Sequence, residues 1–221
     1  MTTEFYRSNY SKIMSLFDLF SDDFNSKSSI YEDRESYYIQ FIESTEFEYY
    51  LSFFQPKEKD RNVNTDQRIK LFDIDFNSGI EIITKNLGVP RLKVSYKKNG
   101  FNTTVLFYKK QFYSHKAILQ FHLLNNSMIY GCLTIPHHDK KITATFNKLL
   151  SVKYSDAIST DFENSIISDT DNNKILYRNY FFPSLIYVGS NVSLIAPAQK
   201  DIDEKESFRI QKHSSEWYER L

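Results

Sequence analysis

Four segments rich in β-branched and aromatic residues follow one another between Arg91 and Ile135, and only a few residues separate each from the next. They read RLKVSYKK, NTTVLFYKK, HKAILQFHLL and SMIYGCLTI. Such residues suit a pleated, half-buried surface. Asn99-Gly100 favours a two-residue hairpin turn, a reversal lies near Ser114-His115, and Asn125-Asn126-Ser127 marks another. Strands joined by short turns pair with their chain neighbours, so this stretch predicts an antiparallel meander.

A helix is predicted immediately before these strands, in the segment SGIEIITKNLGVP. Ser78 and Glu81 have the spacing of a capping box, in which each side chain satisfies a backbone N–H of the first turn. Gly88 suits the left-handed residue that ends a helix, and Pro90 prevents its continuation. The residues expected to face the core are Ile80, Ile83, Thr84 and Leu87. With a strand predicted over Ile69–Phe76, residues 69–135 form the expected central αβββ unit.

The first 68 residues are expected to pack onto that unit. Tyr10–Phe20 has apolar residues on one helical face. Ser36–Phe54, SYYIQFIESTEFEYYLSFF, is dense in tyrosine and phenylalanine and predicts two strands joined near Ser44-Thr45. A single amphipathic helix is the alternative there. Pro56–Arg68 is charged, with almost no apolar residues, and predicts an exposed loop.

The C-terminal third, residues 136–221, is predicted to hold a second helix and further hairpins. Ile142–Val152 has helical periodicity, with Ile142, Phe146, Leu149 and Leu150 inward. The DTDNNK segment, Asp169–Lys174, suits a tight turn between two short strands, and SLIYV predicts one more strand. Asp201–Leu221 is charged and is a candidate closing helix. The fold expected from 1–68, 69–135 and 136–221 together is α+β, an antiparallel meander sheet packed on helices.

Composition restricts the function classes and the compartment. Lys plus Arg and Asp plus Glu number 28 each, so the net charge is zero and the chain lacks the bulk positive charge typical of nucleic-acid binders. Cys132 is the single cysteine, which excludes an intrachain disulfide and a site with several thiolates. It lies in the apolar run MIYGCLTI and is expected to be buried and inert. No secretory signal or membrane-spanning run is recognised, so a cytoplasmic protein is expected.

The order of a helix, the breaker LGVP and three meander strands resembles the αβββ module of β-lactamase-inhibitor-protein-like folds and of small outer-membrane assembly lipoproteins. The similarity covers Ser78–Ile135, about a quarter of the chain, and 142–188 is a candidate second copy without the Gly-x-Pro. The resemblance implies a protein-binding sheet without catalysis. The chain departs from that group in having neither a recognised export signal nor a lipidated cysteine. No functional residue carries over.

Candidate catalytic groups each have a simpler structural interpretation. His137-His138-Asp139 offers ligands for zinc or iron, but adjacent ligands converge poorly, and His115 or His122 would be needed as well. DTDNNK lacks the glycine and the twelfth-position glutamate of a calcium loop. Asp73 and Asp75 are predicted to share a strand face, as paired catalytic carboxylates do. No nucleophile elbow or phosphate loop is present in the sequence.

These observations favour a non-enzymatic protein-binding module, such as an immunity protein or an assembly adaptor, that needs no cofactor. The surplus of aromatics suits interface anchors, and Tyr96, Tyr108 and Tyr130 are the candidate exposed contact residues. One alternative is a metal-assisted hydrolase centred on His137 and His138. Another is single-stranded nucleic-acid binding through the Lys97-Lys98, Lys109-Lys110 and Lys140-Lys141 pairs and nearby tyrosines.

Overall fold

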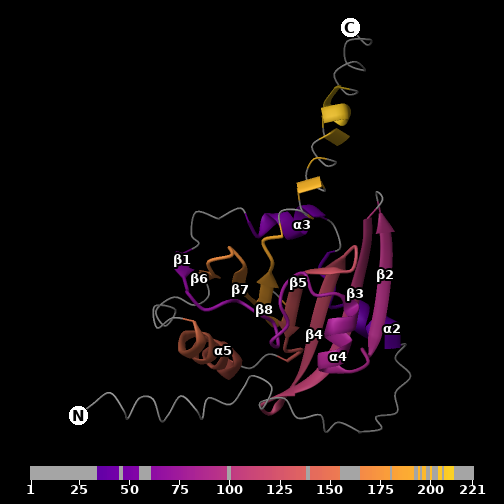
Figure 1. The fold of residues 1–221 in the computed structure, drawn as a ribbon. Helices are drawn as coiled ribbons and strands as arrows, with labels where there is room; N and C mark the ends of the chain where they lie inside the picture. The colour runs from indigo at the N-terminus through magenta and orange to yellow at the C-terminus, as the bar shows by residue number, and fades with distance from the viewer. Residues whose placement is uncertain are drawn as a thin grey trace, which may run out of the picture.

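The computed structural model describes residues 34–44, 47–54, 61–98, 101–137, 140–154, 165–179 and 181–191, with 194, 196–197, 200, 204–205 and 207–211. Within these residues one eight-stranded sheet has the order β1-β6-β7-β8-β5-β4-β3-β2 (Figure 1). Its strands are β1 (Arg61–Asn64), β2 (Leu92–Lys98), β3 (Phe101–Phe112), β4 (His115–Leu124), β5 (Ser127–Thr134), β6 (Ser165–Ser168), β7 (Lys174–Asn179) and β8 (Pro183–Val188). The helices used below are α2 (Arg34–Ile39), α3 (Phe47–Ser52), α4 (Ile80–Leu87) and α5 (Lys140–Lys153). The chain is therefore α+β and mostly sheet.

The sheet is mixed, so the expectation of a wholly antiparallel meander is wrong. β2, β3, β4 and β5 do pair in chain order and antiparallel, as the turn residues indicated. However, β1 runs parallel to β6. β8 lies beside β5, with Tyr130 opposite Val188, and thereby joins the two groups of strands. Each of the three predicted segments of the chain contributes strands to this one sheet.

Side chains cover both faces of the sheet. On the near face in Figure 1, α4, α5 and the segment before α4 pack over the sheet. This layer buries Ile83, Phe146 and Leu150 against inward residues of β3, β4, β5, β7 and β8. On the opposite face, α2 packs over β3 and β4. There α3 places Tyr50 and Phe53 against β5 and β8. Consecutive residues of the central strands point to opposite faces, which is why these strands are buried along nearly their whole length.

The two strands predicted for Ser36–Phe54 are wrong, because the described part of this stretch forms α2 and α3. The buried aromatics are Tyr38, Phe41, Tyr50 and Phe53. They come in pairs three residues apart, in which the first residue lies in the helix and the N–H of the second donates to the carbonyl of the first in the turn just after it. Their density reflects burial against the second face of the sheet, and burial alone does not distinguish a strand from a short helix.

The strand predicted over Ile69–Phe76 is also absent. Leu71 and Ile74 instead pair with each other, their backbones hydrogen-bonding at 3.2 and 3.0 Å. Phe72 and Asp73 between them have φ of 54° and 57° and make a tight turn. The apolar residues of the segment are nevertheless buried in the core. Asp73 and Asp75 therefore do not share a strand face: Asp75 pairs with Lys70 at 3.0 Å.

The loop predicted over Pro56–Arg68 contains a strand that the sequence does not announce. Arg61–Asn64 forms β1 at the edge of the sheet and buries Val63. Thr65 extends the pairing, since its N–H donates to the Ser168 carbonyl at 2.9 Å. Its hydroxyl donates to the Tyr154 carbonyl at 2.9 Å. One apolar residue in four is too weak a pattern to indicate a strand.

The C-terminus of α4 forms as the sequence predicts, but its N-terminus does not. Gly88 has φ 81° and its N–H donates to Thr84 O at 2.9 Å, as predicted for the C-terminus. At the N-terminus the capping position is Gly79, not Ser78, and no capping box forms. The Ile80 N–H instead donates to Asn126 Oδ1, 3.1 Å away in the turn between β4 and β5. A cap from a residue 46 positions away is invisible to local sequence patterns.

The remaining predictions are either confirmed or concern residues outside the described ranges. α5 buries Ile142, Phe146 and Leu150, and the Asp169 turn joins β6 to β7. The helix predicted over Tyr10–Phe20, the residues Asn99-Gly100 and much of Asp201–Leu221 lie outside the described residues.

Candidate functional site

β2 forms one edge of the sheet (Figure 1). It pairs with β3 along its whole length, from Leu92 opposite Phe107 to Lys98 opposite Phe101. Within the described part of the chain, no strand pairs with its other side. In an antiparallel pair, alternate backbone groups of a strand point away from the partner. β2 therefore presents a row of backbone donors and acceptors that a further strand could use.

The side chains of β2 alternate between two environments. Leu92, Val94 and Tyr96 are half-buried and pack against the cluster formed by α2 with β3 and β4. Lys93, Ser95 and Lys97 are exposed on the opposite face. The edge therefore has an apolar side and a polar side, each set by the strand period of two residues.

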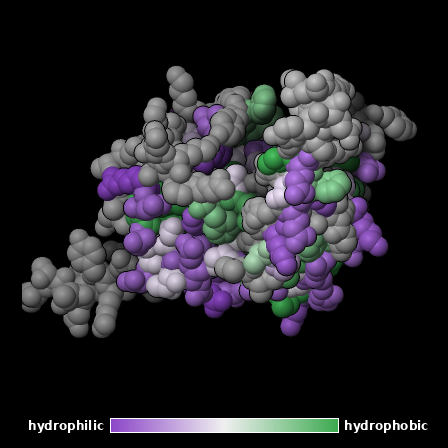
Figure 2. Space-filling view, turned by 90° about the horizontal axis from the view of Figure 1, so that it is seen from above, coloured by the Kyte–Doolittle hydropathy of each residue, from purple (hydrophilic) through white to green (hydrophobic). Residues whose placement is uncertain are grey.

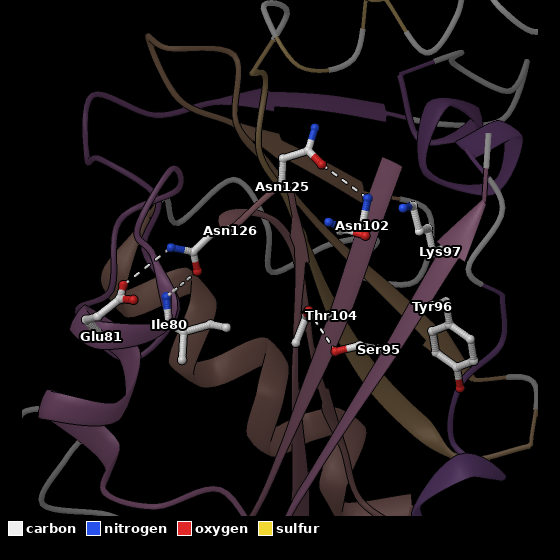
Figure 3. A pocket seen from close by; sticks show the side chains of 9 residues that line it. All are labelled: Ile80, Glu81, Ser95, Tyr96, Lys97, Asn102, Thr104, Asn125 and Asn126. Carbon is white, nitrogen blue, oxygen red and sulfur yellow. Dashed lines mark hydrogen bonds between the residues drawn. The ribbon is translucent and has the colours of Figure 1, made fainter. Parts of the chain in front are cut away.

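A polar cleft of about 720 Å³ opens on the polar side of β2 (Figure 3). Its lining residues are Ile80, Glu81, Ser95, Tyr96, Lys97, Asn102, Thr104, Asn125 and Asn126. They come from β2, β3, the start of α4 and the β4–β5 turn. Figure 3 shows Ser95 and Thr104 pointing toward one another, their hydroxyls 3.1 Å apart, while Tyr96 points away from them.

The two asparagines of the β4–β5 turn hold the walls of this cleft together. Asn125 Oδ1 accepts the Asn102 N–H at 3.1 Å and so fixes the turn to β3. Asn126 Oδ1 accepts the Ile80 N–H, and its amide nitrogen lies 3.4 Å from Glu81 Oε2 (Figure 3). Both asparagines have positive φ, 48° and 66°, which this residue type tolerates. The cleft is thus a preformed feature, because hydrogen bonds from backbone N–H groups to the two asparagine side chains fix its walls.

Charge distinguishes the β2 edge from the neutral chain as a whole. Arg91, Lys93 and Lys97 are exposed along it, and Leu92–Lys98 contains no acidic residue. Among the described residues that line the cleft, Glu81 is the one carboxylate. The described surface seen from above in Figure 2 carries small hydrophobic patches separated by hydrophilic residues.

The three tyrosines predicted as exposed contacts are not brought together. Tyr96 lies on β2 and is half-buried, and burial followed by the charge of Glu35 raises the pKa of its hydroxyl. Tyr108 and Tyr130 are only 2% and 3% exposed, so the expectation that they are exposed is wrong. Their strands are covered on both faces. Tyr108 donates to the Gly88 carbonyl at 3.3 Å, and burial raises its pKa to about 12.

The sequence analysis did not predict a buried polar network that lies under α2 and α3. Gln120 Nε2 donates to the Phe41 carbonyl at 2.9 Å, so its Oε1 faces His122 Nε2, 3.2 Å away. His122 therefore carries its proton on Nε2 and accepts the Tyr50 hydroxyl on Nδ1 at 2.7 Å. Burial lowers the pKa of His122 to about 3, which keeps the ring neutral. The two-residue spacing places Gln120 and His122 on one strand face, but nothing local indicates Tyr50.

The other candidate chemical groups have structural contacts or remain apart. Asp169 is buried and accepts the N–H groups of Ile69 and Asn173, both at 2.8 Å, so it organises a turn. His137 is exposed, and its ring centroid lies 6.4 Å from that of His115. His138 and Asp139 lie outside the described residues. Among the residues the structure does describe, no group of three His, Cys, Asp or Glu side chains is placed to hold a metal ion.

None of the described helices combines the length and apolar character needed to cross a bilayer. No family model, curated protein or solved structure matches this chain.

Proposed function

We propose that this protein is a non-enzymatic binding module that accepts an extended, acidic segment of another protein as an added strand on β2. An immunity protein or an assembly adaptor would act in this way. The observation that carries the proposal is the seven-residue basic strand at the edge of the sheet. Strand addition is a recurring mode of peptide recognition, in which main-chain hydrogen bonds supply affinity and alternate side chains supply specificity.

Half-buried and exposed polar side chains alternate along β2, and this alternation predicts the sequence pattern of the partner segment. An added strand places successive side chains on opposite faces, beside those of β2. On one face they meet Leu92, Val94 and Tyr96, which favour apolar neighbours. On the other face they meet Lys93 and Lys97, which favour carboxylates. The expected partner segment therefore alternates apolar and acidic residues over about seven positions.

Lysines on an edge strand also have a protective role, because they deter unwanted pairing between sheets. The two roles make different predictions for partners of different charge. Simple protection disfavours every added strand, whereas a binding edge disfavours neutral or basic strands and accepts acidic ones. Charge is therefore the variable to test.

The test uses the full chain and synthetic peptides that alternate valine with glutamate, with serine or with lysine. We expect saturable binding of the glutamate peptide alone, measured by calorimetry. Hydrogen exchange should show slower exchange at β2 amides, a readout that contact at another surface would not give. Lys93→Glu with Lys97→Glu should weaken binding about tenfold or more, since both contacts become repulsive. Lys148→Glu on α5, an exposed lysine on a helix that contacts β8 rather than β2, is the control and should leave binding unchanged.

Unaltered exchange at β2 in the presence of the glutamate peptide would refute the proposal, as would equal binding of the three peptides. Single-stranded nucleic acid is the competing occupant. Base stacking on a sheet needs exposed aromatic rings, yet Tyr108 is buried and Tyr96 packs against the α2 cluster. Tight, salt-sensitive binding of an oligonucleotide that Lys93→Glu and Lys97→Glu abolish would favour that alternative and overturn ours.

A further inference from the structure

A second cleft, of about 470 Å³, lies at the other end of β3 from the polar cleft, where the β3–β4 turn meets α2. It is lined by the end of α2 and the residues after it, the start of β4, the residues that follow β5 and those that precede β8. Its volume is within the range usual for small-molecule sites. Four segments that are far apart in the sequence thus converge on one concave surface.

One wall of this cleft is aromatic. Tyr37, Phe41 and Phe182 line it. The rings of Phe41 and Phe182 are 5.7 Å apart at 48°, and those of Tyr37 and Phe41 are 5.5 Å apart, edge to face. Phe41 is buried, and Gln120 holds its carbonyl, so this wall is fixed to the sheet. Rings in such arrangements present both faces and edges to a planar guest.

A second wall carries nitrogen donors. His115, Lys116 and His137 line it, and the two imidazole rings are inclined by only 29° with centroids 6.4 Å apart. Among the described residues that line the cleft, none is aspartate or glutamate. An ammonium group and imidazole N–H groups that line the same cleft as aromatic rings suit a guest with a flat apolar body and a negative end.

We infer that this cleft is a binding site for a small aromatic carboxylate. The ring of the ligand packs against Phe182 and Tyr37, which the buried Phe41 supports, and its carboxylate accepts hydrogen bonds from Lys116 and the two histidines. The site is distinct from the β2 edge, and it does not depend on the function proposed for that edge.

Naphthalene-2-carboxylate is the probe, titrated into the full chain by calorimetry and by NMR chemical-shift mapping. We expect saturation with shifts confined to the amides around the cleft. Naphthalene-2-carboxamide has the same shape without the charge and should bind at least about tenfold more weakly, a difference of ~1.4 kcal/mol. Lys116→Gln should reduce affinity for the carboxylate by a similar factor and leave the carboxamide unaffected. The matched control is Lys85→Gln, which removes an equally exposed charge away from the cleft.

A second variant tests the aromatic wall. Phe182→Leu keeps an apolar side chain but removes the ring, and it should weaken both naphthalene ligands several-fold while the fold, checked by its NMR spectrum, is retained. The inference is overturned by equal affinity for carboxylate and carboxamide, by shifts outside the cleft, or by the absence of saturation at millimolar probe. Failure here leaves the strand-addition proposal untouched, because its variants, Lys93→Glu and Lys97→Glu, lie on β2 outside this cleft.

Discussion

The hydroxyl of Tyr50 donates a hydrogen bond to Nδ1 of His122, 2.7 Å away, across 72 positions of sequence. This bond fastens α3 to the centre of the sheet, and burial holds the pKa of His122 at about 3. The unfolded chain, with a histidine pKa near 6.5, binds the proton more tightly than the folded protein does. The contribution of the neutral ring is therefore complete above about pH 6.5 and is lost as the pH falls toward 3.

The first prediction follows from this difference in the pKa of His122 between the folded and the unfolded chain. Between about pH 6.5 and pH 3, His122 alone should lower the free energy of unfolding by up to ~1.4 kcal/mol per pH unit. This pH dependence of the free energy of unfolding is measured by urea unfolding of the wild type and of His122→Gln at several pH values across that range. The variant keeps a polar side chain without a titrating ring. It should be less stable at neutral pH by about 1–3 kcal/mol, and its stability should depend less on pH. Parallel pH profiles for the two proteins would contradict the prediction.

A second prediction concerns the long-range cap of α4. Asn126→Gly preserves the left-handed backbone of the turn and removes the side chain that accepts the Ile80 N–H. The loss of a helix cap costs about 0.5–2 kcal/mol. Asn172, in the β6–β7 turn, has a similar φ of 61°, so Asn172→Gly is the backbone-matched control and should change stability by a few tenths of a kcal/mol. Chemical denaturation decides, and equal effects of the two substitutions would remove the capping role.

A third prediction rests on the close approach of Gly189 to Phe76. A Cβ at position 189 would lie 2.6 to 3.0 Å from three carbons of the Phe76 side chain, whose ring is packed in the core. Gly189→Ala should therefore destabilise by about 1–3 kcal/mol through overpacking. Combining it with Phe76→Ala should recover part of the loss, since alanine lacks the two Phe76 carbons that approach the new Cβ most closely. Additive effects of the two substitutions would show that the contact is not the cause.

A fourth prediction concerns the thiol of Cys132. It is 4% exposed, and burial raises its pKa to about 11, so the reactive thiolate is scarce in the folded protein. Labelling by a thiol reagent should be negligible under native conditions and should rise with urea in step with the unfolding transition followed by circular dichroism. Rapid stoichiometric labelling of the native protein would contradict the buried position.

Sequence reasoning succeeded where the determinant is local. Gly88 ends α4 because it adopts a positive φ, and Asn125 with Asn126 makes the β4–β5 turn for the same reason. Strands between such turns pair with their chain neighbours, so β2–β5 were predictable. The burial of Cys132 followed from its apolar neighbours.

The errors arose where the determinant is distant. Tyr50 and Phe53 are buried because the second face of the sheet needs a cover, and the sequence does not show that α2 and α3 supply it. The same cover buries Tyr130, and α4 with its neighbours buries Tyr108. Neither proposed site was predicted as a unit. The sequence analysis named Tyr96, which lies on β2, and His137, which lines the second cleft. It did not identify the other segments that form these two sites, because they come from elsewhere in the chain.

The pairing of β8 with β5 has a consequence for synthesis on the ribosome. Tyr130 faces Val188, so the inner side of β5 finds its neighbour only after 58 further residues are added. In a nascent chain that ends before Pro183, the four strands β2–β5 have a long, apolar, unpaired border at β5, which is the kind of surface that nascent-chain chaperones shield and that favours misassembly. Completion of the fold is thus coupled to translation of the last strand.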